Sequence, residues 1–176
     1  MEMNEESILA WNIIEKTSAN LFLTGKAGTG KTTFLKQLKE KSPKRMVVLA
    51  PTGIAAINAG GMTIHSFFQL PFSPYIPGTT FGSGEQKRYQ FSKLKRNIIR
   101  SIDLLVIDEI SMVRSDLLDA IDSVLRQYRK CHDLPFGGVQ LLMIGDLQQL
   151  APVVTAQEEQ LLKEHYDTPF FFSSNA

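Results

Sequence analysis

The sequence has little of several things, and each scarcity excludes a class of protein. Cys131 is the only cysteine, so no internal disulfide can form and we expect an intracellular protein, in the cytoplasm or nucleoid if bacterial. No apolar run approaches the roughly 20 residues that a membrane-spanning helix needs. The acidic start, residues 1–6, is unlike a secretory or mitochondrial leader. We therefore expect no membrane partner.

Net charge is also nearly absent. The chain of 176 residues has 19 Lys and Arg against 18 Asp and Glu, for a formal net charge of +1. A uniformly basic surface is excluded, so any nucleic-acid site must be a local patch. With 43% hydrophobic residues, the chain fits one globular domain that buries about 70% of its unfolded surface.

What the sequence does contain is a glycine-rich phosphate-binding motif. Residues 25–32 read G-x-x-x-x-G-K-T, between an apolar run at 20–24 that fits a strand and a helical pattern at 32–38. Its glycines let backbone N–H groups surround oxyanions, and the start of the next helix adds positive partial charge. Lys31 is predicted to reach the outer phosphates of ATP, and the Thr32 hydroxyl to ligate Mg²⁺. The predicted nucleotide-binding residues are Gly28, Thr29, Gly30, Lys31, Thr32 and Thr33.

Apolar strands alternate with helices, which predicts an α/β fold with a parallel sheet covered on both faces. Strands are expected at 20–24, 45–50, 103–107 and 139–144, with a short aromatic strand near 169–172. Helices are expected at 5–17, 32–41, 53–59, 85–100 and 156–165, with another that Ser115 caps. The first of these helices carries apolar residues all round and is expected to be well buried.

Ligands of parallel sheets bind at the carboxyl ends of the strands. Four segments directly follow predicted strands and are expected to share one rim: 25–32, Thr52, 108–109 and 146–149. On that rim, Asp108 fits a Mg²⁺ partner opposite Thr32, and Glu109 fits the orientation and deprotonation of an attacking water. Gln149 is the predicted sensor of the γ-phosphate, in preference to Gln148. The predicted catalytic residues are Lys31, Glu109 and Gln149.

The acid pair also bears on the class of reaction. A GTPase would carry D-x-x-G at this place and N-K-x-D elsewhere, and neither occurs. A small-molecule kinase has no need of a water-activating glutamate such as Glu109. The pattern therefore favours ATP hydrolysis over transfer to a substrate. A non-motor ATP switch and a nucleotide kinase remain as alternatives.

Five separated motifs together resemble superfamily 1 helicases, closest to the petite-integration-frequency type, which translocate 5′ to 3′. They are Gly25–Thr33 (motif I), Ala50–Ala56 (Ia), Gly61–Phe68 (Ib), Val106–Met112 (II) and Gly145–Val153 (III). The resemblance implies that residues 1–176 form a RecA-like P-loop motor domain, the first of two, in an ATP-dependent DNA helicase. It also implies work in genome maintenance, such as DNA repair, recombination, and telomere or replication-fork processing.

The resemblance further implies a face for single-stranded DNA, formed by Thr52, Gly53, Thr63, His65 and Ser66. Short polar side chains and backbone amides there would hold phosphates, although His65 taken alone could equally be structural. A Pro- and Gly-rich loop at 69–84 lies where such helicases place a strand-separating or gating element, within an insertion at about 69–100. The basic residues that follow either extend the DNA track or form a solvated helix face: Lys87, Arg88, Lys93, Lys95, Arg96 and Arg100.

The sequence departs from the family pattern in two ways. The usual adenine-reading glutamine before motif I is missing, because the first glutamine is Gln37, and Asn4 or Asn12 are the candidate substitutes. The second motor domain, with motifs IV to VI and an arginine finger, does not occur in these residues. Because such a motor binds ATP between two domains, we expect a fragment that needs the partner domain. By itself it should bind ATP, single-stranded DNA and duplex junctions weakly and hydrolyse ATP poorly or not at all.

Overall fold

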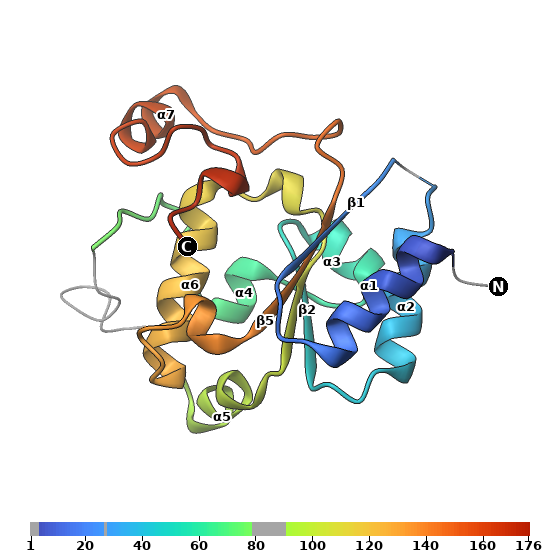
Figure 1. Ribbon diagram of the computed structural model, residues 1–176. Helices are drawn as coiled ribbons and strands as arrows, with labels where there is room; N and C mark the ends of the chain where they lie inside the picture. Colours follow the sequence, from blue (N-terminus) through green and yellow to red (C-terminus); the bar gives the residue numbers. More distant parts are fainter. Residues whose placement is uncertain (1–3, 27, 79–90) are drawn as a thin grey trace.

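A twisted parallel sheet lies at the centre of the molecule (Figure 1). The structure, a computed structural model, describes residues 4–26, 28–78 and 91–176. In this part of the chain five strands pair in the order β1-β5-β4-β2-β3, all in parallel. Their bounds are Leu21–Thr24 (β1), Met46–Ala50 (β2), Met62–Thr63 (β3), Leu104–Ile107 (β4) and Gln140–Gly145 (β5). The predicted α/β fold with a parallel sheet is confirmed.

The helices begin and end where the sequence supplies caps. Their bounds are Glu5–Lys16 (α1), Lys31–Lys41 (α2), Gly53–Ala59 (α3), Ile64–Phe68 (α4), Lys93–Ser101 (α5), Ser115–Arg129 (α6) and Ala156–Leu162 (α7). Asn4 caps α1 by accepting a hydrogen bond from Ser7 N at 2.9 Å. Gly60 ends α3 in the left-handed conformation, with φ of 63°. Short 3₁₀ helices cover Ile110–Met112 (η2), Pro135–Gly138 (η3) and Phe171–Ser173 (η4).

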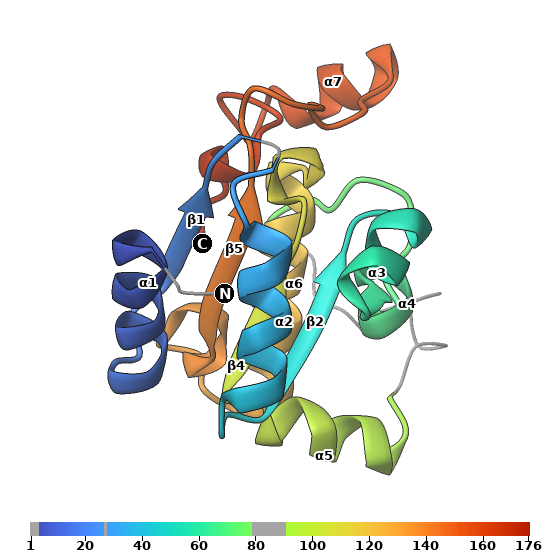
Figure 2. The same cartoon turned by 90° about the vertical axis from the view of Figure 1, so that its right-hand side faces the viewer.

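Helices cover both faces of the sheet, as predicted. Figure 2 shows α2 in front of the strands and α6 behind them. The side chains of β4 alternate between the two faces: Leu104 and Val106 join the core under α1 and α2, whereas Leu105 and Ile107 join the core under α4, α5 and α6. All four are fully buried, which explains the uninterrupted apolar run in this strand.

The prediction that the first helix is well buried is wrong. Only Ala10 and Ile14 of α1 are buried, and 49% of Ile8 and 61% of Leu9 are exposed. The helix packs beside β1, which is the edge strand of the described sheet. At the edge of a sheet only part of a helix reaches the core. Trp11 still packs against that core, with its ring edge-on to Phe34, whereas Ile8 and Leu9 are exposed.

Two further predictions are wrong, the cap at Ser115 and the strand near 169–172. Ser115 is the first residue of α6 rather than its cap, which is Arg114, and the Ser115 hydroxyl donates to Thr168 O at 3.1 Å. The segment near 169–172 forms no strand: a single bridge between Phe170 and Arg114 is followed by η4. One long-range docking explains both, since Ser115 N also donates to Pro169 O at 2.9 Å.

The predicted insertion is described only in part. Residues 69–78 contain neither helix nor strand, and α5 begins at Lys93, where Ser92 accepts a hydrogen bond from Lys95 N at 3.2 Å. The remainder of the predicted loop and basic helix, residues 79–90, lies outside the described residues. Within the described ranges, no helix is long and apolar enough to cross a membrane.

Candidate nucleotide and DNA sites

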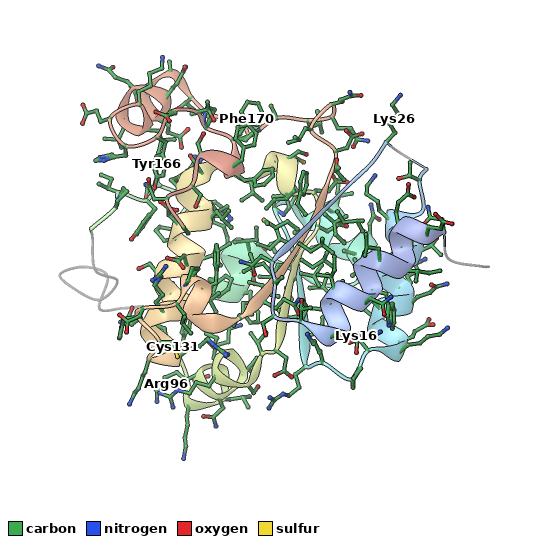
Figure 3. All side chains as sticks on the ribbon, viewed as in Figure 1. Lys16, Lys26, Arg96, Cys131, Tyr166 and Phe170 are labelled. Carbon is green, nitrogen blue, oxygen red and sulfur yellow. The ribbon has the colours of Figure 1, made fainter. Side chains whose placement is uncertain are left out.

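The four predicted rim segments do lie along one edge of the sheet. Thr24 is paired in register with Gly145, and Ile107 with Leu49. Because the four strands are parallel neighbours, their carboxyl ends meet at the same edge. The segments after β1, β5, β4 and β2 therefore come together in that order. Figure 3 shows Lys26, in the loop after β1, at this end of the molecule.

The phosphate loop has the backbone that its glycines predict. Gly28 and Gly30 have φ of 82° and 90°, a backbone conformation that residues with a side chain rarely adopt. A Cβ on Gly25 would lie 2.8 Å from Thr29 Oγ1, whose hydroxyl donates to Lys26 O at 2.9 Å. Gly30 precedes α2 and no side chain caps that helix. The first amides of α2 thus lack an internal side-chain partner, an arrangement that binds anions.

Lys31 is the first residue of α2, and its side chain contacts the phosphate loop. Its ammonium donates hydrogen bonds to Gly25 O and, at 2.9 Å, to Lys26 O. Its positive charge also lowers the pKa values of both Asp108 and Glu109. That influence falls off with distance, so the ammonium and the two carboxylates occupy one neighbourhood.

Burial nevertheless dominates both acids and raises their pKa values above the ordinary range. Asp108 N donates to Leu49 O at 2.8 Å, and Asp108 Oδ1 accepts from Glu109 N at 3.0 Å. The negative charges of Asp108 and Asp146 raise the pKa of Glu109 further. Glu109 has φ of 53°, in the left-handed region that non-glycine residues uncommonly adopt.

Asp146 is a site residue to which the sequence assigned no role. It is 7% exposed, and its Oδ1 accepts from Gln148 N at 2.9 Å. Its backbone oxygen accepts from Gln149 N at 3.1 Å, so it shapes the turn that presents the exposed Gln149 side chain. An acid directly after a buried strand is the signal that could have singled it out.

The oxygen donors at this edge suit Mg²⁺. No group of three metal-binding side chains gathers among the residues that the structure describes. The Thr32 hydroxyl and the Asp108 carboxylate are hard oxygen ligands, and Mg²⁺ in nucleotide sites takes few protein ligands and completes its shell with water and phosphate oxygens. The donor set therefore fits the ion that the sequence predicted.

The predicted DNA-facing residues gather on a second surface beside the rim. Gly53, Thr63, His65 and Ser66 line one open groove of about 480 Å³, together with Pro51, Leu70 and Phe72. Thr52 lies beside it as the cap of α3, accepting from Ala55 N at 3.2 Å. Thr63 Oγ1 likewise accepts from Ser66 N at 3.2 Å. Because capping uses each threonine oxygen as an acceptor, both hydroxyl hydrogens can be donated to phosphates.

Phe72 is a groove residue that sequence reasoning missed. Its ring stacks on His65, with centroids 4.7 Å apart and planes inclined by 22°, and 82% of the residue is exposed. Burial lowers the pKa of His65, which keeps its imidazole neutral near pH 7. The only local signal was an aromatic residue set among the prolines of the irregular loop.

Comparison with known proteins decides the family. A family model described as "PIF1-like helicase" matches residues 3–166. The chain belongs to the PIF1-like helicase family. It is 38% identical to ATP-dependent DNA helicase PIF1 of Candida albicans over 98% of this chain and 19% of that protein. It is 37% identical to ATP-dependent DNA helicase Pif1 of Bdellovibrio bacteriovorus over 87% of this chain and 34% of that protein.

Solved structures of PIF1-like helicases share the fold. Bacteroides Pif1 bound to single-stranded DNA matches with a TM-score of 0.90 at 51% identity, over 99% of this chain and 39% of that one. A Bacteroides Pif1 in complex with ADP-AlF4 matches with a TM-score of 0.91 at 51% identity, over the same shares of the two chains. The predicted RecA-like fold is confirmed. This chain spans well under half the length of these relatives.

The sequence offered two additions to the site, the basic residues up to Arg100 and an asparagine that reads adenine. Residues of both groups make contacts within the protein. The Lys95 ammonium lies 3.7 Å above the Phe67 ring, and Arg100 Nε donates to Tyr128 O at 3.1 Å, so these cations of α5 contact protein groups. Figure 3 shows Arg96 of the same helix at the end of the molecule opposite Lys26. The choice between a DNA track and a solvated helix face therefore stays a prediction for Lys93 and Arg96, and Lys87 and Arg88 lie outside the described residues.

Asn4, one of the two candidate substitutes for the adenine-reading glutamine, is hydrogen-bonded within its own helix start. The Asn4 side chain accepts from Ser7 N and donates to Glu6 Oε2 at 2.9 Å, which commits it to the start of α1. Asn12 remains the candidate that the sequence offered.

Proposed function

We propose that residues 1–176 form the first motor domain of an ATP-dependent 5′-to-3′ DNA helicase, with ATP bound at the rim and single-stranded DNA in the groove. The observation that carries the proposal is the order of the parallel strands, which brings the phosphate loop, the Asp108–Glu109 pair and the turn at Asp146 to one edge of the sheet. It supports one nucleotide site built from segments far apart in the sequence. The names of the relatives, and the Bacteroides Pif1 complexes with single-stranded DNA and ADP-AlF4, support the two ligands.

In this proposal the loop amides and Lys31 hold the phosphates, and Thr32 and Asp108 hold Mg²⁺. The ion supplies neutralisation of phosphate charge. Glu109 accepts the proton of the attacking water, and its raised pKa brings it closer to the working pH of a general base. Asp146 contributes to that rise. Gln149, presented by the Asp146 turn, registers the loss of the γ-phosphate.

On the DNA side, the hydroxyls of Thr52, Thr63 and Ser66 and the backbone at Gly53 hold phosphates, with His65 and Phe72 as a stacking platform. A second RecA-like domain supplies an arginine finger and closes the nucleotide site. Duplex junctions, genome maintenance and an intracellular setting belong to the same proposal.

DNA-stimulated ATP turnover in the full-length protein tests the proposal. Oligo(dT) is expected to raise turnover, and Glu109→Gln to lower it by about 100-fold or more while ATP affinity is retained, because the amide keeps the shape but cannot accept a proton. Turnover that ignores DNA would favour a non-motor switch. Phosphoryl transfer to a nucleoside monophosphate in a coupled assay would favour a kinase. Duplex unwinding by residues 1–176 alone would contradict the need for a partner domain.

A further inference from the structure

Arg114 lies outside the five sequence motifs and the DNA groove. Its side chain binds two carboxylates, one on Asp116 in α6 and one on Glu158 in α7. Its Nε and Nη2 atoms donate to Asp116 Oδ1 and Oδ2 at 2.8 and 2.9 Å, and its Nη1 donates to Glu158 Oε1 at 2.9 Å. The side chains are 14%, 1% and 23% exposed for Arg114, Asp116 and Glu158. A guanidinium held by two carboxylates with so little exposure has a fixed orientation.

Toward the DNA groove, the connection runs through Asp116. Its Oδ2 also accepts from Tyr75 N at 2.9 Å, so the ion pair anchors the irregular segment 70–76 from behind. That segment carries Phe72, which stacks on His65. A cavity of about 160 Å³ lies between the segment and α6, and His65, Arg114 and Asp116 are among the residues that line it. The charges of Arg114 and Asp116 both act on the pKa of His65.

Toward the nucleotide edge, the connection runs through the turn after Glu109. Met112 N donates to Glu109 O and Val113 N to Ile110 O, each at 3.0 Å, and this turn leads directly into Arg114. Ile110 and Val113 are fully buried, so the turn packs as a rigid piece. A shift of Glu109 can therefore reach Arg114 through the four residues between them, 110–113.

A second path to the nucleotide edge enters through α7. Glu158 belongs to the capping box of this helix, with Thr155 as the other member. The segment that carries Gln149 leads into the same cap. Arg114 thus connects three parts of the protein. Glu158 links it to the segment after β5, the chain itself links it to the turn after β4, and Asp116 links it to the wall of the DNA groove.

We propose that Arg114, paired with Asp116 and Glu158, is a positioning residue that transmits the nucleotide state to the DNA groove. The inference rests on the proposed function. Bending of the turn after Glu109 or of the segment after Gln149 moves the guanidinium, and Asp116 carries the movement to the segment that holds Phe72 against His65. Discrete rearrangement is expected because a buried, bidentate pair does not deform continuously.

The experiment measures the affinity of this chain for fluorescein-labelled oligo(dT), with and without ADP–aluminium fluoride, and takes the ratio of the two affinities. The test variant is Glu158→Gln. It removes one of the two charges that hold Arg114 and leaves Asp116 in place. A glutamine at this position still completes a capping box, so α7 is retained. Glu159→Gln is the matched control: it makes the same change one residue later, where the partner is the exposed Lys163 at 3.0 Å. Arg114→Lys keeps the charge and loses the planar fork.

We expect the nucleotide-dependent ratio to fall about threefold or more toward one in Glu158→Gln and Arg114→Lys, and to be unchanged in Glu159→Gln. A ratio that Glu158→Gln leaves at the control value would overturn the inference. Equal weakening of DNA binding in both nucleotide states would also overturn it, because the network would then be only structural. If the unmodified chain binds neither oligo(dT) nor nucleotide, the proposed function itself fails. If it binds both without any coupling, only the inference fails.

Discussion

Gly145, the last residue of β5, packs directly against Ile110 in the turn that follows Glu109. A Cβ at position 145 would lie 2.8 Å from Ile110 Cγ2 and 3.2 Å from the backbone nitrogens of Ile110 and Ser111. Ile110 and Ser111 are buried, so neither can move freely aside. The position of the proposed general base therefore depends on the absence of a side chain on the neighbouring strand.

Gly145→Ala should lower both stability and turnover. We expect the free energy of unfolding to fall by about 1–3 kcal/mol because the added methyl overpacks the contact. ATP turnover should fall more than ATP affinity, since the clash displaces Glu109 rather than the phosphate loop. Urea unfolding and steady-state ATP turnover measure the two effects.

A double-mutant cycle identifies the contact responsible. Ile110→Ala removes the Cγ2 atom, so Gly145→Ala should cost less in that background than alone. Strict additivity of the two stability changes would show that the methyl clashes elsewhere.

Asp108→Asn should stabilise the protein at neutral pH while it abolishes Mg²⁺-dependent turnover. Burial raises the pKa of Asp108, so its contribution to stability is complete below the unfolded pKa and is lost as pH rises through the higher folded pKa. At pH 7.5 the buried negative charge of Asp108 lowers the stability of the folded state, and the neutral asparagine side chain removes that charge. We expect a gain in the free energy of unfolding at pH 7.5 that disappears in acid, where the carboxyl is protonated in both the folded and the unfolded state.

Asp103→Asn provides a control of opposite sign. Hydrogen bonds from Arg45 lower the pKa of Asp103 to about 2. Its stabilisation is present above the ordinary carboxyl range and is lost as pH falls toward 2. Asp103→Asn should therefore destabilise at neutral pH, with a difference that fades in acid. If both substitutions changed the free energy of unfolding in the same direction at neutral pH, the assignment of the two pKa shifts would be contradicted.

Phe72→Ala should weaken binding of single-stranded DNA without changing its salt dependence. Loss of one stacking platform costs about 1–3 kcal/mol, or roughly 5- to 150-fold in affinity. The slope of affinity against salt counts phosphate contacts, which this substitution leaves intact. Phe172→Ala is the matched control, because Phe172 is also exposed, at 58%, and also stacked, on Phe170. Equal losses in the two variants would exclude a specific role for Phe72.

Asp119→Ala should loosen the carboxyl-terminal segment. Asp119 is 7% exposed and accepts from Tyr166 Oη at 2.8 Å, Asn175 Nδ2 at 3.2 Å and Ala176 N at 3.1 Å, and also from Ser174 Oγ. Removing the acceptor leaves these donors unpaired, so we expect a loss of about 2–4 kcal/mol. Tyr166→Phe removes one donor only and should cost about 1 kcal/mol. Hydrogen exchange at 168–176 that is unaffected by Asp119→Ala would contradict this anchoring role.

The sequence by itself determined four of the five described strands, most helices and the rim. Each depends on information within a few residues: the glycines of the phosphate loop, the apolar run before Asp108, the proline that follows α2. Once the strands are known to be parallel, their carboxyl ends must share an edge, so the meeting of Lys31 with the acid pair followed without any tertiary contact being known.

Only the tertiary structure decided how distant segments dock. Ser115 looked like a cap because the local pattern is that of a cap, but its hydroxyl is bound by Thr168. The outward apolar face of α1 follows from the place of β1 at the sheet edge. The Arg114–Asp116–Glu158 network and the stacking of Phe72 on His65 depend on where irregular segments pack. Such packing leaves no periodic trace, because the free energy that fixes it comes from long-range burial and hydrogen bonding rather than from local backbone preference.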